Sequence, residues 1–139
     1  MASKINTPTK VIFDTNIWIT YTINAQTSLL IDFIVDNEIT LFTCSSLINE
    51  FEEVLSRKKF KKYVTPPISK YVSVHKKIAS FVDIEYSFVG SPDPKDDFLF
   101  DLAEHTEATH LVTGDKKLWD FSYKRLQIIS HTDFKKLFI

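Results

Sequence analysis

The chain has 139 residues, of which 44% are hydrophobic and 25% are charged, and its formal net charge at pH 7 is −1. This length and balance are typical of one soluble globular domain, and they exclude a disordered, fibrous or repeat protein. We therefore predict a single domain over residues 1–139.

The longest apolar runs are interrupted by charge before the roughly 20 residues that a membrane-spanning helix needs. The N-terminus also lacks a long apolar secretory segment, so we expect a cytoplasmic protein without a membrane segment. Cys44 is the only cysteine, which excludes an intramolecular disulfide and predicts a reduced, partly buried thiol.

The first half of the chain alternates strand and helix patterns. KVIFD, residues 10–14, is rich in β-branched and aromatic side chains and predicts a buried strand. Residues 16–38 place apolar side chains at helical spacing, with a break near NAQTS. ITLFTCS, residues 39–45, predicts a second strand, and residues 45–60 predict a helix with one apolar stripe.

The second half continues this alternation. Residues 65–81 begin with prolines and predict a helix, and residues 82–89 predict a third strand. Residues 90–108 open as a proline-bearing loop and become a helix near Asp96. The last predicted elements are strands at residues 109–115 and 126–130 and a helix at residues 131–139.

Strands that alternate with helices predict a three-layer α/β/α domain around a mainly parallel sheet of four or five strands. In such folds, ligands bind outside the carboxyl ends of the strands. Asp14 and Asp115 each follow an apolar strand at that end. We therefore expect the chemistry of this protein at that edge of the sheet.

Four acidic residues stand out by their position. Asp14 and Asp115 follow strands, Glu50 lies on a helix and Asp96 stands at a helix start. Gathered carboxylates suit Mg²⁺ or Mn²⁺, which prefer oxygen ligands. Such an ion can activate a water and neutralise the charge that builds on a phosphodiester during hydrolysis. Without a cation, clustered carboxylates raise one another's pKa.

Three blocks carry a resemblance that covers nearly the whole chain. They are VIFDTNIWI, TCSSLINEFEEVLSR and SPDPKDDFLFDLAEHTEATHLVTGD, in this order. With them the sequence resembles the PIN-domain family of metal-dependent nucleases and, within it, the VapC-like toxins of bacterial toxin–antitoxin pairs. The resemblance implies an endoribonuclease that uses Mg²⁺ or Mn²⁺, has RNA as its substrate and is neutralised by a cognate antitoxin protein.

The resemblance also implies roles for single residues. Asp14, Asp96 and Asp115 would bind the metal, directly or through water, and Glu50 would complete the acidic pocket. All four acids would be catalytic, and Glu50 also counts among the metal ligands. Asp97 is an alternative ligand beside Asp96, although two neighbours on a helix point about 100° apart.

Two further positions, Asn16 and Thr113, match residues that support the pocket by hydrogen bonds. Many family members carry a second acid two residues after the Thr-Gly-Asp aspartate, where this chain has Lys117. This departure leaves open whether one or two metal ions bind.

Charge is segregated along the chain. Residues 57–77 contain eight lysines and arginines and no acid, whereas residues 83–107 contain eight acids and a single lysine. Such a basic stretch predicts contacts to an RNA backbone, with a solvated helix end as the equally weighted alternative. The residues predicted to bind RNA are Arg57, Lys58, Lys59, Lys61 and Lys62.

Two other functions share part of the pattern. A catalytically silent PIN-like module would bind RNA or protein without cutting, but the four retained acids argue against it. A phosphatase of the haloacid dehalogenase type also starts from an aspartate after the first strand. It needs a second acid two residues later, where this chain has Asn16.

We also expect a homodimer. Its contacts would involve aromatic and apolar residues of surface helices, such as Trp18, Tyr21 and Phe33.

Overall fold

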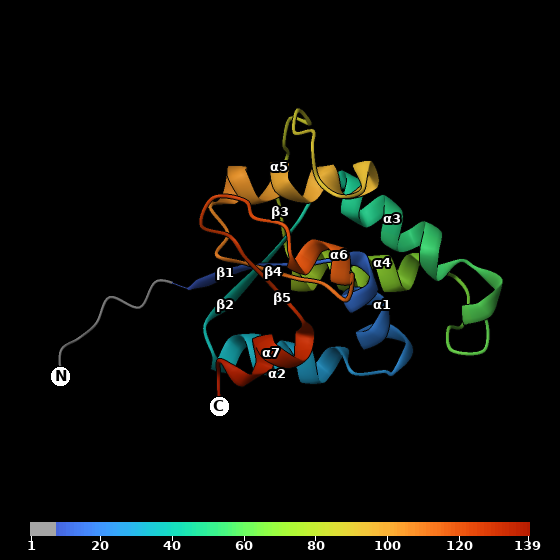
Figure 1. Cartoon of the computed structure of the whole chain (residues 1–139). Helices are drawn as coiled ribbons and strands as arrows, with labels where there is room; N and C mark the ends of the chain where they lie inside the picture. The colour runs from blue at the N-terminus through green and yellow to red at the C-terminus, as the bar shows by residue number, and fades with distance from the viewer. Residues whose placement is uncertain (1–7) are drawn as a thin grey trace.

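A five-stranded sheet forms the centre of the structure, a computed structural model that describes residues 8–139 (Figure 1). The strands lie in the order β3-β2-β1-β4-β5, and all four neighbouring pairs are parallel. This confirms the predicted parallel sheet. The strands are β1 Thr9–Phe13, β2 Ile39–Thr43, β3 Ser80–Phe81, β4 His110–Val112 and β5 Gln127–Ile129.

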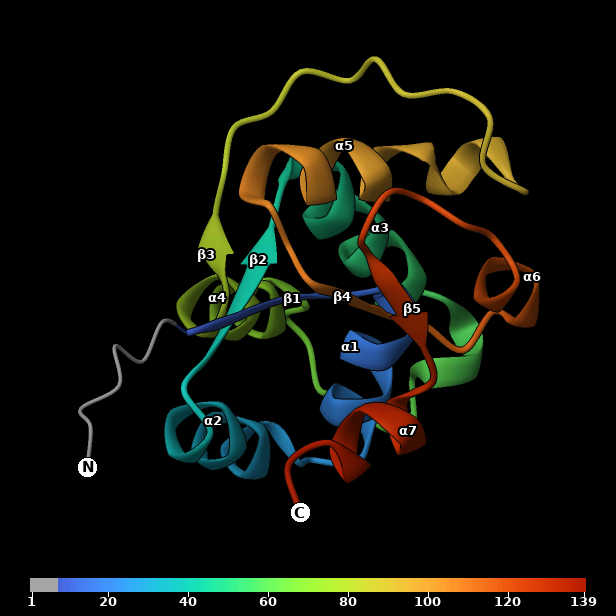
Figure 2. The same ribbon diagram turned by 60° about the vertical axis from the view of Figure 1, so that its left-hand side comes forward.

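Helices cover both faces of this sheet. In Figures 1 and 2, α5 lies on one face and α2 and α7 lie on the other, which confirms the predicted three-layer arrangement. Among residues 8–139, no helix is both long enough and apolar enough to span a membrane. The α-helices are α1 Thr15–Ile23, α2 Thr27–Asp36, α3 Ser45–Leu55, α4 Ser69–Ile78, α5 Asp97–Thr106, α6 Lys116–Trp119 and α7 His131–Lys136, with 3₁₀ turns η1 Lys58–Phe60 and η2 Pro94–Asp96.

The central strand β1 is fixed by aromatic packing at its carboxyl end. Phe13 is fully buried, and its ring centroid lies 5.8 Å from that of Trp18, 6.0 Å from that of Tyr21 and 6.1 Å from that of Phe134. Burying a side chain of this size contributes about 2–3 kcal/mol. The residue that follows, Asp14, is therefore presented from a rigid support.

The predicted third strand at residues 82–89 is wrong. Strand β3 ends at Phe81, and the Val82 N–H makes one more hydrogen bond to the sheet, to Thr43 O at 2.9 Å; the segment after it runs past α5 (Figure 2). The backbone N–H groups of Ser87 and Phe88 donate instead to a carboxylate oxygen of Asp101 on α5, at 3.1 and 3.0 Å. A side chain thus supplies the acceptors that a neighbouring strand would otherwise supply.

The helices on either side of residues 57–62, which are predicted to bind RNA, are shorter than predicted. Helix α3 ends at Leu55, and α4 begins only at Ser69. Residues 57–62 lie between these two helices, in η1 and the exposed chain around it. Each proline disfavours a helical backbone at the residue before it, here Thr65 and Pro66, which explains why α4 does not extend back to residue 65.

Three side chains are more buried than the sequence pattern predicts. Trp18 and Tyr21 belong to the core, with 1% and 8% of their surface exposed, and Cys44 is fully buried. The prediction that Trp18 and Tyr21 present a dimer surface is therefore wrong. The large apolar side chains that α2 does expose are Leu29, Ile31 and Val35, while Phe33 is partly buried. Homodimerisation itself stays a prediction.

Candidate active site

Asp14 joins the central strand to the first helix. Its backbone N–H donates to Val112 O of β4 at 2.9 Å, and its Oδ1 accepts the Thr15 N–H at 2.7 Å as the N-cap of α1. Its Oδ2 accepts the Thr113 hydroxyl at 2.8 Å. Only 7% of Asp14 is exposed. Both oxygens are thus held at the carboxyl ends of two neighbouring strands.

The Thr113 hydroxyl also ties Asp115 to this point. It accepts the Asp115 backbone N–H at 3.0 Å while it donates to Asp14. Asp115 in turn caps α6 by accepting the Lys117 N–H at 3.0 Å, and Trp119 Nε1 donates to Thr113 O at 2.8 Å. One buried hydroxyl therefore sets the spacing of two acidic residues.

Glu50 reaches the same place from α3. The hydroxyl of Thr15 donates to Glu50 Oε1, so the first residue of α1 contacts both Asp14 and Glu50. A continuous chain of hydrogen bonds consequently runs from Glu50 through Thr15, Asp14 and Thr113 to Asp115.

These acids line one open pocket of about 200 Å³. The pocket brings together the four acidic residues singled out from the sequence, and Asn16 and Arg57 with them. Sequence reasoning missed Asp93 and Lys95, although both stand within three residues of Asp96. The lining consists of Asp14, Thr15, Asn16, Glu50, Val54, Arg57, Asp93, Lys95, Asp96 and Asp115.

Asp97 lies outside this lining. Its Oδ1 accepts the backbone N–H of Ser91 at 3.1 Å and also the Ser91 hydroxyl. Asp93 instead caps η2, the turn that carries Asp96, by accepting the Lys95 N–H at 3.1 Å. Asp97 therefore closes the loop that precedes α5, while Asp93 and Asp96 face the pocket.

The pocket disfavours negative charge on its own carboxylates. Burial, then the charges of four acids, raises the pKa of Asp96 to about 7; these acids are Asp14, Asp93, Asp115 and Glu50. Burial also raises the pKa of Asp14, against the hydrogen bonds from Thr113 and Thr15 that lower it. The pKa of Glu50 is raised mainly by burial.

Two positively charged side chains border this pocket, and one of them already pairs with a carboxylate outside it. Arg57 forms two hydrogen bonds to the Glu53 carboxylate, at 3.0 and 3.1 Å, and the other cation is Lys95. Five carboxylates thus face two positive side chains in the lining. This excess of negative charge fits a divalent cation.

The spacing of the acids limits how such an ion could be held. Within residues 8–139, no three His, Cys, Asp or Glu side chains come close enough to hold one metal ion together. Mg²⁺ keeps several waters and is often held by only one or two carboxylates. The residues present therefore fit an ion that some of the acids reach through water, and the ligand set stays a prediction.

Thr113→Val tests the role of the shared hydroxyl. Valine keeps the shape but leaves Asp14 Oδ2 and the Asp115 N–H without their partner, so we expect the free energy of unfolding to fall by about 1–2 kcal/mol. Chemical denaturation measures this loss. Thr113→Ser keeps the hydroxyl, and it should retain more stability than Thr113→Val does; equal losses in both variants would contradict this role.

Comparisons with known proteins show the family and the fold of the chain. A sequence profile described as PIN domain matches residues 10–117, which is more than half of the chain. No curated protein matches the chain significantly. The crystal structure of VapBC2 from Rickettsia felis bound to a DNA fragment from their promoter contains a chain of similar fold.

That match has a TM-score of 0.56 and 16% sequence identity, and it covers 86% of this chain and 96% of the other. An identity this low shows a common fold. The sequence profile shows the family, so the chain belongs to the PIN domain family of nucleases.

Proposed function

We propose that this protein is an endoribonuclease that uses Mg²⁺ or Mn²⁺, and that it is the toxin of a toxin–antitoxin pair. The observation that carries the proposal is the pocket at the carboxyl edge of the sheet, where five carboxylates face two cations. Burial and mutual repulsion make this arrangement unfavourable unless a cation compensates it.

A divalent ion bound there would supply charge stabilisation and a more acidic water. The chain's own residues do the positioning. Thr15 and Thr113 hold Glu50 and Asp14 by hydrogen bonds, so that the acids keep their orientation. Glu50 is suited to hold the attacking water, because its carboxylate is half-buried and the Thr15 hydroxyl fixes one oxygen.

RNA as substrate is supported by the surface beside the pocket. Arg57 belongs to the pocket lining, and the exposed lysines that follow it extend a positive surface away from the acids. Such a surface binds a phosphate backbone without regard to sequence. We propose a protein partner because the fold resembles that of a chain in the structure of VapBC2 bound to DNA.

One observation favours a second candidate function. The acids do not converge closely enough for three of them to hold an ion together. A PIN domain that binds RNA through its basic surface and does not cut it fits this spacing as well.

Cleavage with and without metal separates the two candidates. We expect the purified protein to cut unstructured RNA with Mn²⁺ and to leave it intact with EDTA, because the acids need a cation to act. Gel electrophoresis of end-labelled RNA gives the measurement. Binding without cleavage in Mn²⁺ would favour the silent module, and equal cleavage in EDTA would indicate a contaminating nuclease and contradict the proposal.

A further inference from the structure

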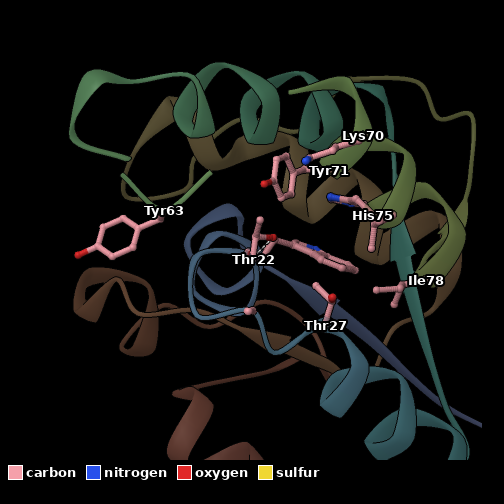
Figure 3. A pocket seen from close by; sticks show the side chains of 10 residues that line it. Thr22, Thr27, Tyr63, Lys70, Tyr71, His75 and Ile78 are labelled. Atoms are coloured by element: carbon pink, nitrogen blue, oxygen red, sulfur yellow. Dashed lines mark hydrogen bonds between the residues drawn. The ribbon is translucent and has the colours of Figure 1, made fainter. Parts of the chain in front are cut away.

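A second cavity, of about 350 Å³, is lined by residues further along α1 than those of the acidic pocket and has no part in the proposed chemistry. Figure 3 shows Lys70, Tyr71 and His75, which come from α4, on one side and Thr22 and Thr27 across from them. Trp18 and Tyr63 also contribute to its wall.

Two buried rings in this wall carry polar atoms without partners. Trp18 and His75 are each 1% exposed and stack with centroids 3.9 Å apart at 15°. His75 Nε2 contacts the Thr43 hydroxyl at 3.0 Å, but His75 Nδ1 and Trp18 Nε1 have no hydrogen-bond partner. In residues 8–139 they are the only buried side-chain nitrogen or oxygen atoms in this state.

Leaving such buried atoms unpaired costs folding free energy, because neither water nor protein replaces the lost hydrogen bond. Burial lowers the pKa of His75 to about 4, so the ring is neutral at physiological pH and offers a donor or an acceptor rather than a charge. The unpaired ring nitrogens of Trp18 and His75 in the cavity wall thus suit a flat ligand whose edge carries both acceptors and donors.

The mouth of the cavity combines aromatic rings with lysines. Lys70 Nζ lies 5.1 Å from the centroid of the Tyr71 ring, and Lys62 Nζ lies 5.2 Å from that of Tyr63. The Tyr71 hydroxyl accepts the Thr65 N–H at 2.8 Å, which fixes its ring against the loop. Rings beside cations are the elements with which proteins bind single-stranded nucleic acid.

The cavity is also within reach of the acidic pocket. Asn16 lines the pocket and Thr22 lines the cavity, and both belong to α1. Six residues of helix span about 9 Å along the axis. The loop between α3 and α4, which we call the basic loop, also joins the two sites, because Arg57 lines the pocket and Tyr63 lines the cavity.

We propose that this cavity is a nucleotide subsite, which takes one unpaired base of single-stranded RNA against Tyr71 while Lys70 and Lys62 hold the flanking phosphates. The inference rests on the proposed function in that RNA is the ligand. It does not require cleavage, and the RNA strand would run along α1 and the basic loop from the cavity to the acidic pocket.

Binding of a short oligouridylate to the whole protein in EDTA tests the subsite, because no cutting interferes. We expect Tyr71→Leu to weaken binding about tenfold, since losing one base-stacking contact costs about that much. Tyr71→Phe keeps the ring but loses the hydrogen bond from Thr65, so it should lose less binding than Tyr71→Leu does. Lys70→Gln should weaken binding more than its matched control Lys77→Gln, an exposed change on α4 outside the cavity.

Nuclear magnetic resonance provides a direct reporter, because the chain has two tryptophans. The indole N–H signal of Trp18 should shift with RNA more than that of Trp119, whose N–H is already bonded to Thr113 O. A Trp18 signal that ignores RNA but moves with a leucine-rich helical peptide would assign the cavity to a protein and overturn the proposal.

Failure of the subsite and failure of the nuclease are distinguishable. Metal-dependent cleavage together with unchanged binding by Tyr71→Leu would overturn the subsite alone. A Trp18 shift and weaker binding by Tyr71→Leu, without any cleavage, would support the subsite in a protein that binds RNA silently.

Discussion

Asp14→Asn will lose metal-dependent RNA cleavage by about 10³-fold or more, because the change removes one of the charges that attract the cation at the centre of the pocket. Asparagine is as good an N-cap as aspartate, so α1 should keep its start. Its side-chain oxygen can still accept the Thr15 N–H, and its amide can donate to the Thr113 hydroxyl.

The fold should therefore survive this substitution. Burial raises the pKa of Asp14, which means that its charge is unfavourable in the metal-free protein, and the neutral variant should unfold at the same temperature or a higher one. Calorimetry in EDTA measures this, and cleavage of end-labelled RNA measures activity. Asp32→Asn, an exposed change on α2, is the matched control and should cut normally. Full activity of Asp14→Asn would contradict the proposed role of the acids.

Much of the fold follows from local patterns. The buried strand at residues 10–14 has no polar residue between Val11 and Phe13, and such runs predict a sheet covered on both faces. Residues 82–89 show which contacts local patterns do not contain. Their apolar residues resemble a strand, but the acceptors come from Asp101, more than ten residues away in the sequence, and no local pattern contains that contact.

The candidate site was predictable to the extent that strand ends define it. Asp14 and Asp115 follow β1 and β4, which pair directly, so parallel topology alone places them together. Asp93 was missed because a proline-bearing loop gives no periodicity from which to place a side chain. The sequence of α1 is apolar on several sides and marks no covered face, so only the packed structure shows that Trp18 and Tyr21 are buried.

The arrangement of hydrogen bonds explains how one short motif organises the site. Asp-Thr-Asn places a carboxylate at a strand end and a hydroxyl at the first helical residue, and that hydroxyl binds the acid of α3. Thr113, directly after β4, donates its hydroxyl to the other oxygen of Asp14 and accepts the backbone N–H of Asp115. Asp14 and Glu50 are thus oriented by neutral threonines rather than by a cation of the protein, which leaves their negative charge available to a metal ion.

In the metal-free protein, the free energy of unfolding should fall as the pH rises from about 4 to about 7. The pKa of Asp96 is about 7 in the folded protein, against an ordinary value of 3.8, because burial and four neighbouring acids disfavour its charge. The folded state therefore binds a proton that the unfolded state has lost over this range. The contribution is fully present below the ordinary pKa and is lost as the pH passes the folded one.

Denaturation in EDTA at several pH values measures this fall, which we expect to be about 1–2 kcal/mol because the half-buried carboxyl is partly screened by water. Asp96→Asn removes the titrating group and should flatten this part of the profile, whereas Asp32→Asn should follow the original protein. Excess Mg²⁺ or Mn²⁺ at about pH 8 should restore stability to the original protein more than to Asp96→Asn, because a ligand that binds only the folded state stabilises it. The same profile for the original protein and for Asp96→Asn would show that the pKa of Asp96 is not raised in the folded protein. The charge argument for a cation site in this pocket would then fail.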